Sequence, residues 1–547
     1  MAVNPRTALV ALATLAASPL AAATAAVPPM LLGQPLDAKT PLGFVTMTKT
    51  GALMDESGAL FRWISYNVPN LLMVEDRPPV VDGYPLCRRQ VDDPSSGDNG
   101  MFFGDEDGRT CLVPSNGQNA WEWVLPDPWE QEDAIRTVAG AGGKVIRTYT
   151  LGIGPKYHIV GPNKFNEAAF VAMDNALAIA RKYGIRLIVP FINQWTWFGD
   201  YHDLAKQRGK DGSVFFTDAQ LRQDFKNIIS FVLRRVNTVN GVRYGNDPTI
   251  LAWQLGNELG GWDGPAPPGS WTVEMAQFIK SLAPKTLVMD GTMGGLDATK
   301  RYTSAALRSK YVDVFSNHYY YGSSDLARIA TDSSYVASFG KAFVIGEFGL
   351  TDTATIESVL KATIANTKVS GAMIWSLRFH SSLGGFYTHY EKDSFWAYHA
   401  PGFPSTDGGF APDEKAVVPL MRKYAIKTFA SIGANAKVPF PVPPTPASVS
   451  GASPWALIWR GSTWAASYTV ERAVSVPAPN SKGKIDVTKI KWAVISRGVL
   501  DNVAWGMPIF SDDDSDESSQ YWYKITAVGV DGTASTGSLL IGPVANS

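Results

Sequence analysis

The sequence predicts an α/β fold, a (β/α)8 TIM barrel, followed by a small all-β sandwich. Between Phe61 and Phe379, short apolar runs alternate with longer stretches of helical spacing, which is typical of βα units around a parallel sheet. Eight such runs occur, and eight strands close a barrel. The expected strands cover residues 61–68, 143–150, 185–193, 250–258, 286–291, 312–320, 342–349 and 371–379.

Amphipathic helices are expected between the strands. The stretches 166–184 and 218–237 place apolar residues at every third or fourth position and end near Gly or Asn. Such helices would cover the outside of the sheet. An open, doubly wound sheet could use the same units, but no glycine-rich phosphate loop follows an early strand, which favours the barrel.

Residues 1–26 have the pattern of a signal peptide. A positive charge at Arg6 precedes an apolar run from Ala8 to Ala23, and small residues follow at a suitable cleavage position. A membrane anchor is the alternative, but the run is interrupted by Pro19 and is shorter than the roughly 20 residues that cross a bilayer. We therefore expect an exported protein, extracellular or periplasmic, without membrane attachment after cleavage.

The barrel domain is expected to cover residues 27–436, with an unusually long connection at 69–133 after the first strand. The two cysteines of the chain, Cys87 and Cys111, both lie in this connection. In an exported protein such a pair is expected to form a disulfide. Two free thiols or a metal pair are the alternatives, and neither a CxxC spacing nor a nearby histidine supports a metal.

A proline-rich linker at 437–447 leads to an expected all-β domain at 448–547. Alternating runs separated by turn residues predict a β-sandwich, and the segment YWYKITAVGVDGTAS resembles fibronectin type III domains. Nothing in this domain indicates catalysis, so a spacer, a stabilising buttress or a sugar-binding module is expected. The acidic run 512–517 could hold calcium, but it lacks the glycine and spacing of an EF-hand, which favours a solvated loop.

The charge balance argues against a polyanionic partner. Lys and Arg number 49 and Asp and Glu number 50, so the chain has no excess of basic residues of the kind that binds nucleic acid. The chain has 17 Trp, and several aromatic residues stand beside Gly, Asn or Asp, where they could stack on sugar rings. Most aromatic side chains are nevertheless core residues. A neutral ligand is therefore expected.

Polar residues end several of the predicted strands, and in a TIM barrel the carboxyl ends of the strands face the active site. Two of them are glutamates, Glu258 and Glu347, at strand ends three units apart. Glycoside hydrolysis uses such a pair, one acid that protonates the leaving oxygen and one carboxylate that attacks or activates water. Either glutamate alone could be a helix-start carboxylate. The pair, with Arg147 and Tyr320 at neighbouring strand ends, favours catalysis.

The neighbours of the two carboxyl groups are expected to separate their roles. A nearby cation and a hydroxyl donor lower the pKa of a carboxyl that must stay ionised as a nucleophile. Burial and the like charge raise the pKa of its partner, which then acts as an acid. Residue types alone do not show which glutamate is which.

Five motifs together resemble glycoside hydrolase family 5, part of a large clan whose acid/base follows strand four and whose nucleophile follows strand seven. The motifs are VIRTY (145–149), LGNE (255–258), NHYY (317–320), VIGEFG (344–349) and IWSL (374–377). The resemblance covers the whole barrel and implies a role for each matching residue.

By this resemblance Glu258 is the acid/base, Glu347 is the nucleophile and Asn257 binds the 2-hydroxyl of the substrate. Trp375 would be the floor under the sugar at the cleavage point. Three further residues would support the carboxylates: Arg147, His318 and Tyr320.

Longer segments resemble endo-β-1,4-mannanases of the plant and fungal type. They are INQWTWFGDY (192–201), FFTDAQLRQDFKNII (215–229) and NGVRYGNDPTILAWQLGNE (240–258). This resemblance implies that Asn193, Trp195 and Trp197 line the glycone side. The chain departs from the pattern at NELGGW, where those enzymes usually continue NEPR, and in segment 378–403. Trp262 and His380, one in each departure, are expected to contact sugar.

Segment 378–403 also raises the possibility of a metal site formed by His380, His389, Glu391 and His399. The spacing matches no standard ligand pattern, and the glycine and aromatic content suits sugar contact better. No metal and no cofactor is therefore expected.

The sequence leaves three functions to weigh. The favoured one is a retaining endo-β-1,4-mannanase that acts on mannan-type polysaccharides. A second is another β-glycan hydrolase of family 5, an exo-β-mannosidase or a β-glucanase. A third is a carbohydrate-binding protein that has lost catalysis, and the presence of both Glu258 and Glu347 speaks against it. The oligomeric state stays open.

Overall fold

The structure is a computed structural model, and it describes the parts of the chain that hold the site. They are residues 32–37, 42–74, 124–261, 266–320, 322–387, 397–402, 414–429, 438–502, 506 and 508–545. Seven short strands are described by their backbone alone: β4 (Val80–Val81), β5 (Tyr84–Pro85), β6 (Cys87–Arg89), β7 (Met101–Gly104), β8 (Arg109–Val113), β18 (Tyr390–Glu391) and β19 (Ser394–Phe395). The expected signal peptide lies outside the described residues.

Eight parallel strands form a closed barrel, as predicted. They are β3 (Trp63–Asn67), β9 (Val145–Arg147), β12 (Arg186–Asn193), β13 (Ile250–Asn257), β14 (Leu287–Met289), β15 (Val314–Tyr319), β16 (Ala342–Gly349) and β17 (Val369–Trp375). Neighbours in the ring follow one another in the sequence, and the ring closes between β17 and β3. Each predicted strand overlaps one of these strands.

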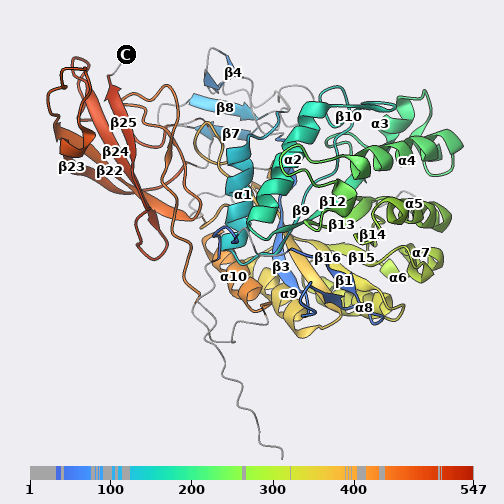
Figure 1. The fold of residues 1–547 in the computed structure, drawn as a ribbon. Helices are drawn as coiled ribbons and strands as arrows, with labels where there is room; N and C mark the ends of the chain where they lie inside the picture. Colours follow the sequence, from blue (N-terminus) through green and yellow to red (C-terminus); the bar gives the residue numbers. More distant parts are fainter. Residues whose placement is uncertain are drawn as a thin grey trace, which may run out of the picture. The chain divides into compact units, whose positions relative to one another are not determined.

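The helices between the strands lie outside the ring (Figure 1). The helices predicted at 166–184 and 218–237 are confirmed as α2 (Glu167–Lys182) and α4 (Ala219–Arg234). Helix α1 (Pro128–Gly140) begins with a capping box between Asp127 and Glu130. The others are α3 (Tyr201–Lys206), α5 (Gly269–Leu282), α6 (Ala298–Arg301), α7 (Ser304–Arg308), α8 (Asp325–Ala337), α9 (Thr353–Ala365) and α10 (Glu414–Ile426).

A hydrophobic core fills the barrel at the amino ends of its strands. Gly371 makes room there for Trp63, since a Cβ at Gly371 would lie 2.0 Å from the indole ring. The hairpin of β1 (Thr46–Met47) and β2 (Leu53–Met54) contributes Leu53 to the same core. The interior is therefore packed, and the carboxyl ends of the strands are left as the place for a site. A second hairpin, β10 (Ile159–Gly161) with β11 (Lys164–Phe165), lies between β9 and α2.

The C-terminal region is all-β, as predicted. Four antiparallel strands form a sheet in the order β23-β22-β24-β25, and two more strands pair beside it. They are β22 (Ala465–Ser475), β23 (Lys491–Val499), β24 (Tyr521–Gly529), β25 (Leu539–Val544), β20 (Ala447–Ser448) and β21 (Trp459–Arg460). Trp459, Tyr468 and Tyr523 are buried in its core. Residues Leu31–Ser547 cluster as one compact unit, so this region and the barrel belong together. The likeness to fibronectin type III domains stays a prediction.

The cysteine pair lies in the long connection after β3. Cys87 in β6 stands opposite Cys111 in β8 in an antiparallel register. Their side chains lie outside the described residues, so the disulfide stays a prediction. Within the part of the chain that the structure describes, no helix combines the length and the apolar character needed to cross a membrane.

A buried ion pair ties α2 to the segment after α4 and generates a stability prediction. Asp174 is fully buried and accepts hydrogen bonds from Arg235 and from the Tyr244 hydroxyl, both at 2.6 Å. We expect Asp174→Ala to lower the free energy of unfolding by about 3–5 kcal/mol, because the buried guanidinium loses its buried partner. Chemical denaturation measures this change. Asp297→Ala, at an exposed ion pair, is the control and should leave the free energy of unfolding unchanged. Equal stability of the two variants would contradict the prediction.

Candidate active site

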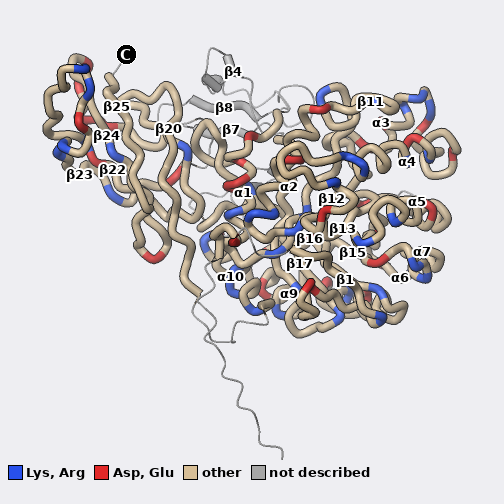
Figure 2. Tube along the Cα trace, in the orientation of Figure 1, with Lys and Arg blue, Asp and Glu red and all other residues tan. Residues whose placement is uncertain are grey.

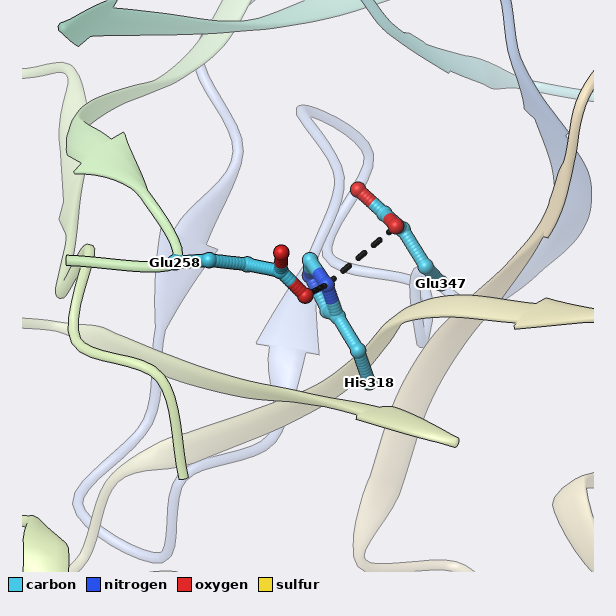
Figure 3. A group of neighbouring side chains, drawn as sticks. All are labelled: Glu258, His318 and Glu347. Atoms are coloured by element: carbon cyan, nitrogen blue, oxygen red, sulfur yellow. Dashed lines mark hydrogen bonds and ion pairs between the residues drawn. The ribbon is translucent and has the colours of Figure 1, made fainter. Parts of the chain in front are cut away.

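Three titratable side chains converge at the carboxyl ends of β13, β15 and β16 (Figure 3). His318 lies between two glutamates, with its Nδ1 2.6 Å from Oε1 of Glu258 and 3.2 Å from Oε2 of Glu347. One oxygen of each carboxylate and one ring nitrogen of His318 all lie within 4.8 Å of one another. The two glutamates that end separate strands therefore face each other across one small space.

Glu347 is held by donors on both of its carboxylate oxygens. Nη1 of Arg147 donates to Oε1 at 2.7 Å, and the hydroxyl of Tyr320 donates to Oε2 at 2.5 Å. Glu347 is 5% exposed and Arg147 is 0% exposed, so this ion pair is shielded from water. Charge-assisted hydrogen bonds of this kind fix the orientation of the carboxylate and favour its ionised form.

A β-bulge turns Glu347 toward the mouth of the barrel. Val344 of β16 points into the barrel core, and strict alternation would point residue 347 outward. The register of β16 shifts by one residue against both β15 and β17 just before Glu347, so one extra residue is inserted there. Gly346 lies at this insertion, and a Cβ on it would be 2.7 Å from Nε2 of His318. The glycine therefore admits the His318 ring.

Glu258 follows β13 in a left-handed backbone conformation, with φ 50°. For a residue with a Cβ this conformation costs on the order of 1–2 kcal/mol, so the surrounding structure must impose it. Oε2 of Glu258 accepts a hydrogen bond from the indole N–H of Trp195, while Oε1 faces His318. A small open pocket adjoins Glu258 and His318 and continues along residues 291–294. The carboxylate thus stands at the edge of a small pocket.

Burial and charge act in opposite directions on these groups. Burial by itself raises the pKa of Glu347, but the charges of His318 and Arg147 and the Tyr320 hydroxyl outweigh it and hold this pKa at about 2. Burial by itself lowers the pKa of His318, but the carboxylates of Glu347 and Glu258 raise it to about 9. At neutral pH Glu347 is therefore ionised and His318 is positively charged.

Arg147 joins Glu347 to the opposite side of the barrel. Its Nη2 donates to Oδ1 of Asn257 at 2.6 Å, and its Nε donates to Oε1 of Gln254 at 2.9 Å. Nδ2 of Asn257 donates in turn to Oδ1 of Asn193 at 3.0 Å. The amide of Asn257 is therefore oriented from two sides.

Aromatic rings cluster beside the carboxylates. The ring centroid of Tyr149 lies 4.7 Å from that of Trp197, 5.6 Å from that of Phe198 and 5.9 Å from that of Trp375. Burial, together with the negative charge of Glu347, raises the pKa of Tyr149 well above its usual range, so the phenol stays neutral. Trp375 ends β17 and is 6% exposed. These rings provide apolar surface next to the two carboxylates.

Among the described residues, Glu258, His318 and Glu347 are also the one set that could hold a metal ion. Their oxygens already accept hydrogen bonds from Arg147, Tyr320 and Trp195. A metal would have to compete with a guanidinium and displace these donors. The donor set therefore suits a pair of hydrogen-bonded carboxylates better than a metal centre.

Two residues predicted to contact sugar are buried. Asn193 is fully buried and its Oδ1 accepts a hydrogen bond from Asn257, so the structure adds no support to its predicted sugar contact. His380 is 2% exposed, and its two ring nitrogens face Asp133 and Asp501, so its predicted sugar contact gains no support either.

The metal site considered in segment 378–403 gains no support. The rings of His380 and His399 bond to different partners, and His399 lies against Glu414 and the carbonyl of Tyr387. Three other predicted residues have side chains outside the described part of the chain: Trp262, His389 and Glu391.

Sequence reasoning missed two residues of the site, Gln254 and Tyr149. Both could have been found by period-two alternation, because Gln254 lies four residues before Glu258 and Tyr149 lies two residues after Arg147. Each lies an even number of residues from one that was identified.

Comparisons with known proteins agree with this geometry. Residues 203–400 match a family model described as glycoside hydrolase family 5, β-mannosidase-like. This part of the barrel is therefore similar to glycoside hydrolase family 5. The matched part contains Glu258, His318, Glu347 and Trp375, whereas Arg147 precedes it.

The chain is also similar to named proteins of Solanum lycopersicum, Arabidopsis thaliana and Rhizomucor miehei. The chain is 28% identical over 338 residues to mannan endo-1,4-beta-mannosidase 1 of Solanum lycopersicum, which covers 52% of this chain and 85% of that protein. It is 36% identical over 194 residues to mannan endo-1,4-beta-mannosidase 7 of Arabidopsis thaliana, which covers 33% of this chain and 45% of that protein. The crystal structure of an endo-1,4-beta-mannanase from Rhizomucor miehei matches with a TM-score of 0.50 at 19% identity, over 71% of this chain and 99% of that one. The last match shows the fold alone.

The charge on His318 generates a pH prediction. Its pKa is raised to about 9 from an unfolded value of about 6.5, so its stabilising effect is complete below pH 6.5 and is lost as the pH rises through 9. We expect the melting temperature of the parent protein to fall more between pH 7 and pH 9.5 than that of His318→Asn. Groups that titrate in both proteins cancel in this comparison. Parallel curves from thermal denaturation would show that His318 carries no such charge.

Proposed function

We propose that this protein is a family 5 enzyme, a retaining endo-β-1,4-mannanase with Glu347 as nucleophile and Glu258 as acid/base. The observation that carries the proposal is the approach of one oxygen of each carboxylate to within 4.8 Å. Retaining glycosidases hold their carboxyl groups about 5 Å apart, whereas inverting ones hold them roughly 6.5–9.5 Å apart to admit a water molecule. The spacing therefore favours double displacement.

In the first step, an oxygen of Glu347 attacks the anomeric carbon, and a C–O bond to the enzyme forms as the glycosidic bond breaks. Glu258, protonated at this stage, gives its proton to the leaving oxygen. The low pKa of Glu347 keeps the attacking carboxylate ionised at neutral pH. In the second step, Glu258 removes a proton from water, whose oxygen attacks the same carbon and releases Glu347.

The neighbouring residues support these two steps. Asn257, whose Oδ1 accepts from Arg147, is the residue we assign to the 2-hydroxyl of the sugar, and a hydrogen bond there gains strength in the transition state. Trp375, which packs with Tyr149 and Tyr320, is the proposed floor under the sugar. Trp195 and Trp197, on the loop after β12, add aromatic surface: the Trp195 indole donates to Glu258, and the ring of Trp197 lies 6.2 Å from that of Trp375.

Three observations support a mannan-type polysaccharide as the substrate. The relatives named above are mannan endo-1,4-beta-mannosidases. Acidic and basic residues are interspersed over the helices around the barrel, which suits a neutral partner (Figure 2). The aromatic cluster suits the faces of sugar rings. An exo-β-mannosidase and a β-glucanase use the same chemistry, and the substrate test below separates them. Export and the Cys87–Cys111 disulfide are part of the proposal and rest on the sequence pattern.

Removal of either carboxylate tests the mechanism. We expect Glu347→Ala and Glu258→Ala to lower kcat/KM by about 1,000-fold or more, because each group acts in the transition state. Glu357→Ala, at an exposed ion pair on α9, is the control.

Azide distinguishes the two roles, with an aryl β-mannobioside as substrate. In Glu347→Ala, azide attacks from the side that the carboxylate occupied and yields an α-glycosyl azide. In Glu258→Ala, azide attacks the glycosyl–enzyme and yields a β-glycosyl azide. The opposite pair of products, identified by NMR, would exchange the assignments, and full activity of Glu347→Ala would refute the proposal.

Product sizing tests endo action and the choice of sugar. We expect mannan, glucomannan and galactomannan to release oligosaccharides of mixed length with the β-anomer formed first, and cellulose to release little. Chromatography of early products and NMR of the fresh anomer measure this. Release of monosaccharide from chain ends would identify an exo-β-mannosidase, and faster hydrolysis of cellulose would identify a β-glucanase.

A further inference from the structure

A buried polar cluster joins the barrel to the C-terminal β domain, residues 448–545. At its centre is His380, whose Nδ1 lies 2.8 Å from Oδ2 of Asp133 and whose Nε2 lies 3.1 Å from Oδ2 of Asp501. Asp133 belongs to α1 of the barrel, and Asp501 follows β23 of the β domain. The three side chains are 2–6% exposed. We call Asp133, His380 and Asp501 the interface triad.

Residues of the β domain complete the hydrogen bonding of both carboxylates. The hydroxyl of Thr463 donates to Oδ1 of Asp133 at 2.6 Å, and the hydroxyl of Tyr468 donates to Oδ2 of Asp501 at 2.5 Å. The backbone N–H of His380 donates to Asp133 at 3.0 Å. The triad is therefore a shared network to which barrel and β domain both contribute.

The surfaces around the triad fit each other closely. Trp464 of the β domain is fully buried and donates its indole N–H to the carbonyl of Thr137 in α1 at 3.2 Å. A Cβ at Gly140 would lie 2.2 Å from that indole nitrogen, and a Cβ at Gly461 would lie 2.2 Å from the His380 ring. Glycine at both positions lets the two domains meet without a gap.

His380 is a buried cation rather than a second reactive group. Burial by itself lowers its pKa, but Asp133 and Asp501 raise it to about 10, so the ring is charged at neutral pH and donates from both nitrogens. Its ring also stacks on Phe386 with centroids 3.7 Å apart. With both nitrogens bonded and the ring buried, its role is to hold its own segment of chain in place.

That segment begins at the candidate active site. His380 lies five residues after Trp375, and the N–H of Leu377 between them donates to the carbonyl of Asn67 at 2.9 Å. The side chain of Asn67 accepts from Arg147 at 3.2 Å and donates to the carbonyl of Gly346 at 3.0 Å. A shift of His380 would therefore displace Trp375 at the floor of the site. Through Asn67 it would also displace Arg147, which holds the nucleophile.

We propose that Asp501 and His380 are positioning residues for catalysis, so that the β domain, through the interface triad, fixes Trp375 and the residues around the nucleophile. This inference rests on the proposed function, because it assigns the β domain a part in the same site. It is distinct from a linker or a sugar-binding module, since it needs no ligand on the β domain. The triad acts from within the fold, and none of its members touches substrate.

The test uses the full chain with graded variants at one position. Asp501→Asn keeps an acceptor for His380 and Tyr468, and Asp501→Ala keeps none. We expect kcat on mannan to fall modestly in the first and by about 10-fold or more in the second, because small misplacement of reacting groups is costly. KM for the polymer should change by less than about threefold, since subsites away from the cleavage point are intact. Kinetics are measured well below the melting temperature of each variant.

Controls separate positioning from stability. Asp486→Asn, at an exposed carboxylate of the β domain, should leave kcat and melting temperature unchanged. Thr463→Val removes one hydrogen bond from Asp133 and should reproduce a milder loss of kcat even where Asp501→Ala fails to fold. Lower melting temperatures in these variants with kcat unchanged would overturn the inference.

The result also stays distinguishable from failure of the proposed function. If Glu347→Ala abolishes hydrolysis while Asp501→Ala and Thr463→Val keep the parent kcat, the function stands and the inference falls. If the parent protein cleaves no β-glycan, the function falls, and the triad is then tested by calorimetry. If Asp501→Ala melts in two transitions where the parent melts in one, the triad couples the barrel to the β domain. An unchanged single transition would overturn this coupling.

Discussion

Two carboxylates can lie side by side in the mouth of this barrel only because positive charge lies between and behind them. Within 4.8 Å of each other and at an effective dielectric constant of about 20, they repel by on the order of 3 kcal/mol or more. His318 offsets it from between the pair, and Arg147 offsets it from the side of Glu347 alone. This asymmetry separates the roles: Glu347 contacts two cations and a phenol, whereas Glu258 shares one cation and accepts a neutral indole. The charge pattern therefore favours Glu347 as the group that stays ionised.

A buried arginine and two departures from regular strand geometry hold these charges in place. Arg147 is buried completely, and its guanidinium bonds to Asn67, Gln254, Asn257 and Glu347, so little desolvation cost is left uncompensated. The bulge at Gly346 redirects a side chain that alternation would send outward. The left-handed backbone at Glu258 turns the other carboxylate toward it. The two departures from regular strand geometry therefore lie at Glu258 and directly before Glu347.

The sequence was sufficient to predict the barrel and the position of the two glutamates at the ends of its strands. Strand count and order follow from apolar periodicity, and position at strand ends follows from that periodicity and the barrel rule. The bulge at Gly346 could not be predicted, because a one-residue register shift depends on pairing with β15 and β17. The placement of His318 between two carboxylates depends on that same shift. The burial of Asn193 behind Asn257 could not be predicted either, because it is a property of packing across strands.

His380 shows why composition alone does not decide a residue's role in segments that join domains. Histidine, glycine and aromatic residues suit a sugar-binding loop, but they suit a buried joint equally well. The deciding partner, Asp501, lies 121 residues away in the chain, so no local pattern reveals it. Because the last strand of the barrel leads directly from Trp375 into this joint, the floor of the site and the β domain share one segment. A barrel separated from that domain would leave a cationic ring and the carboxylate of Asp133 exposed where they are now buried, and it would free one end of the segment that carries Trp375.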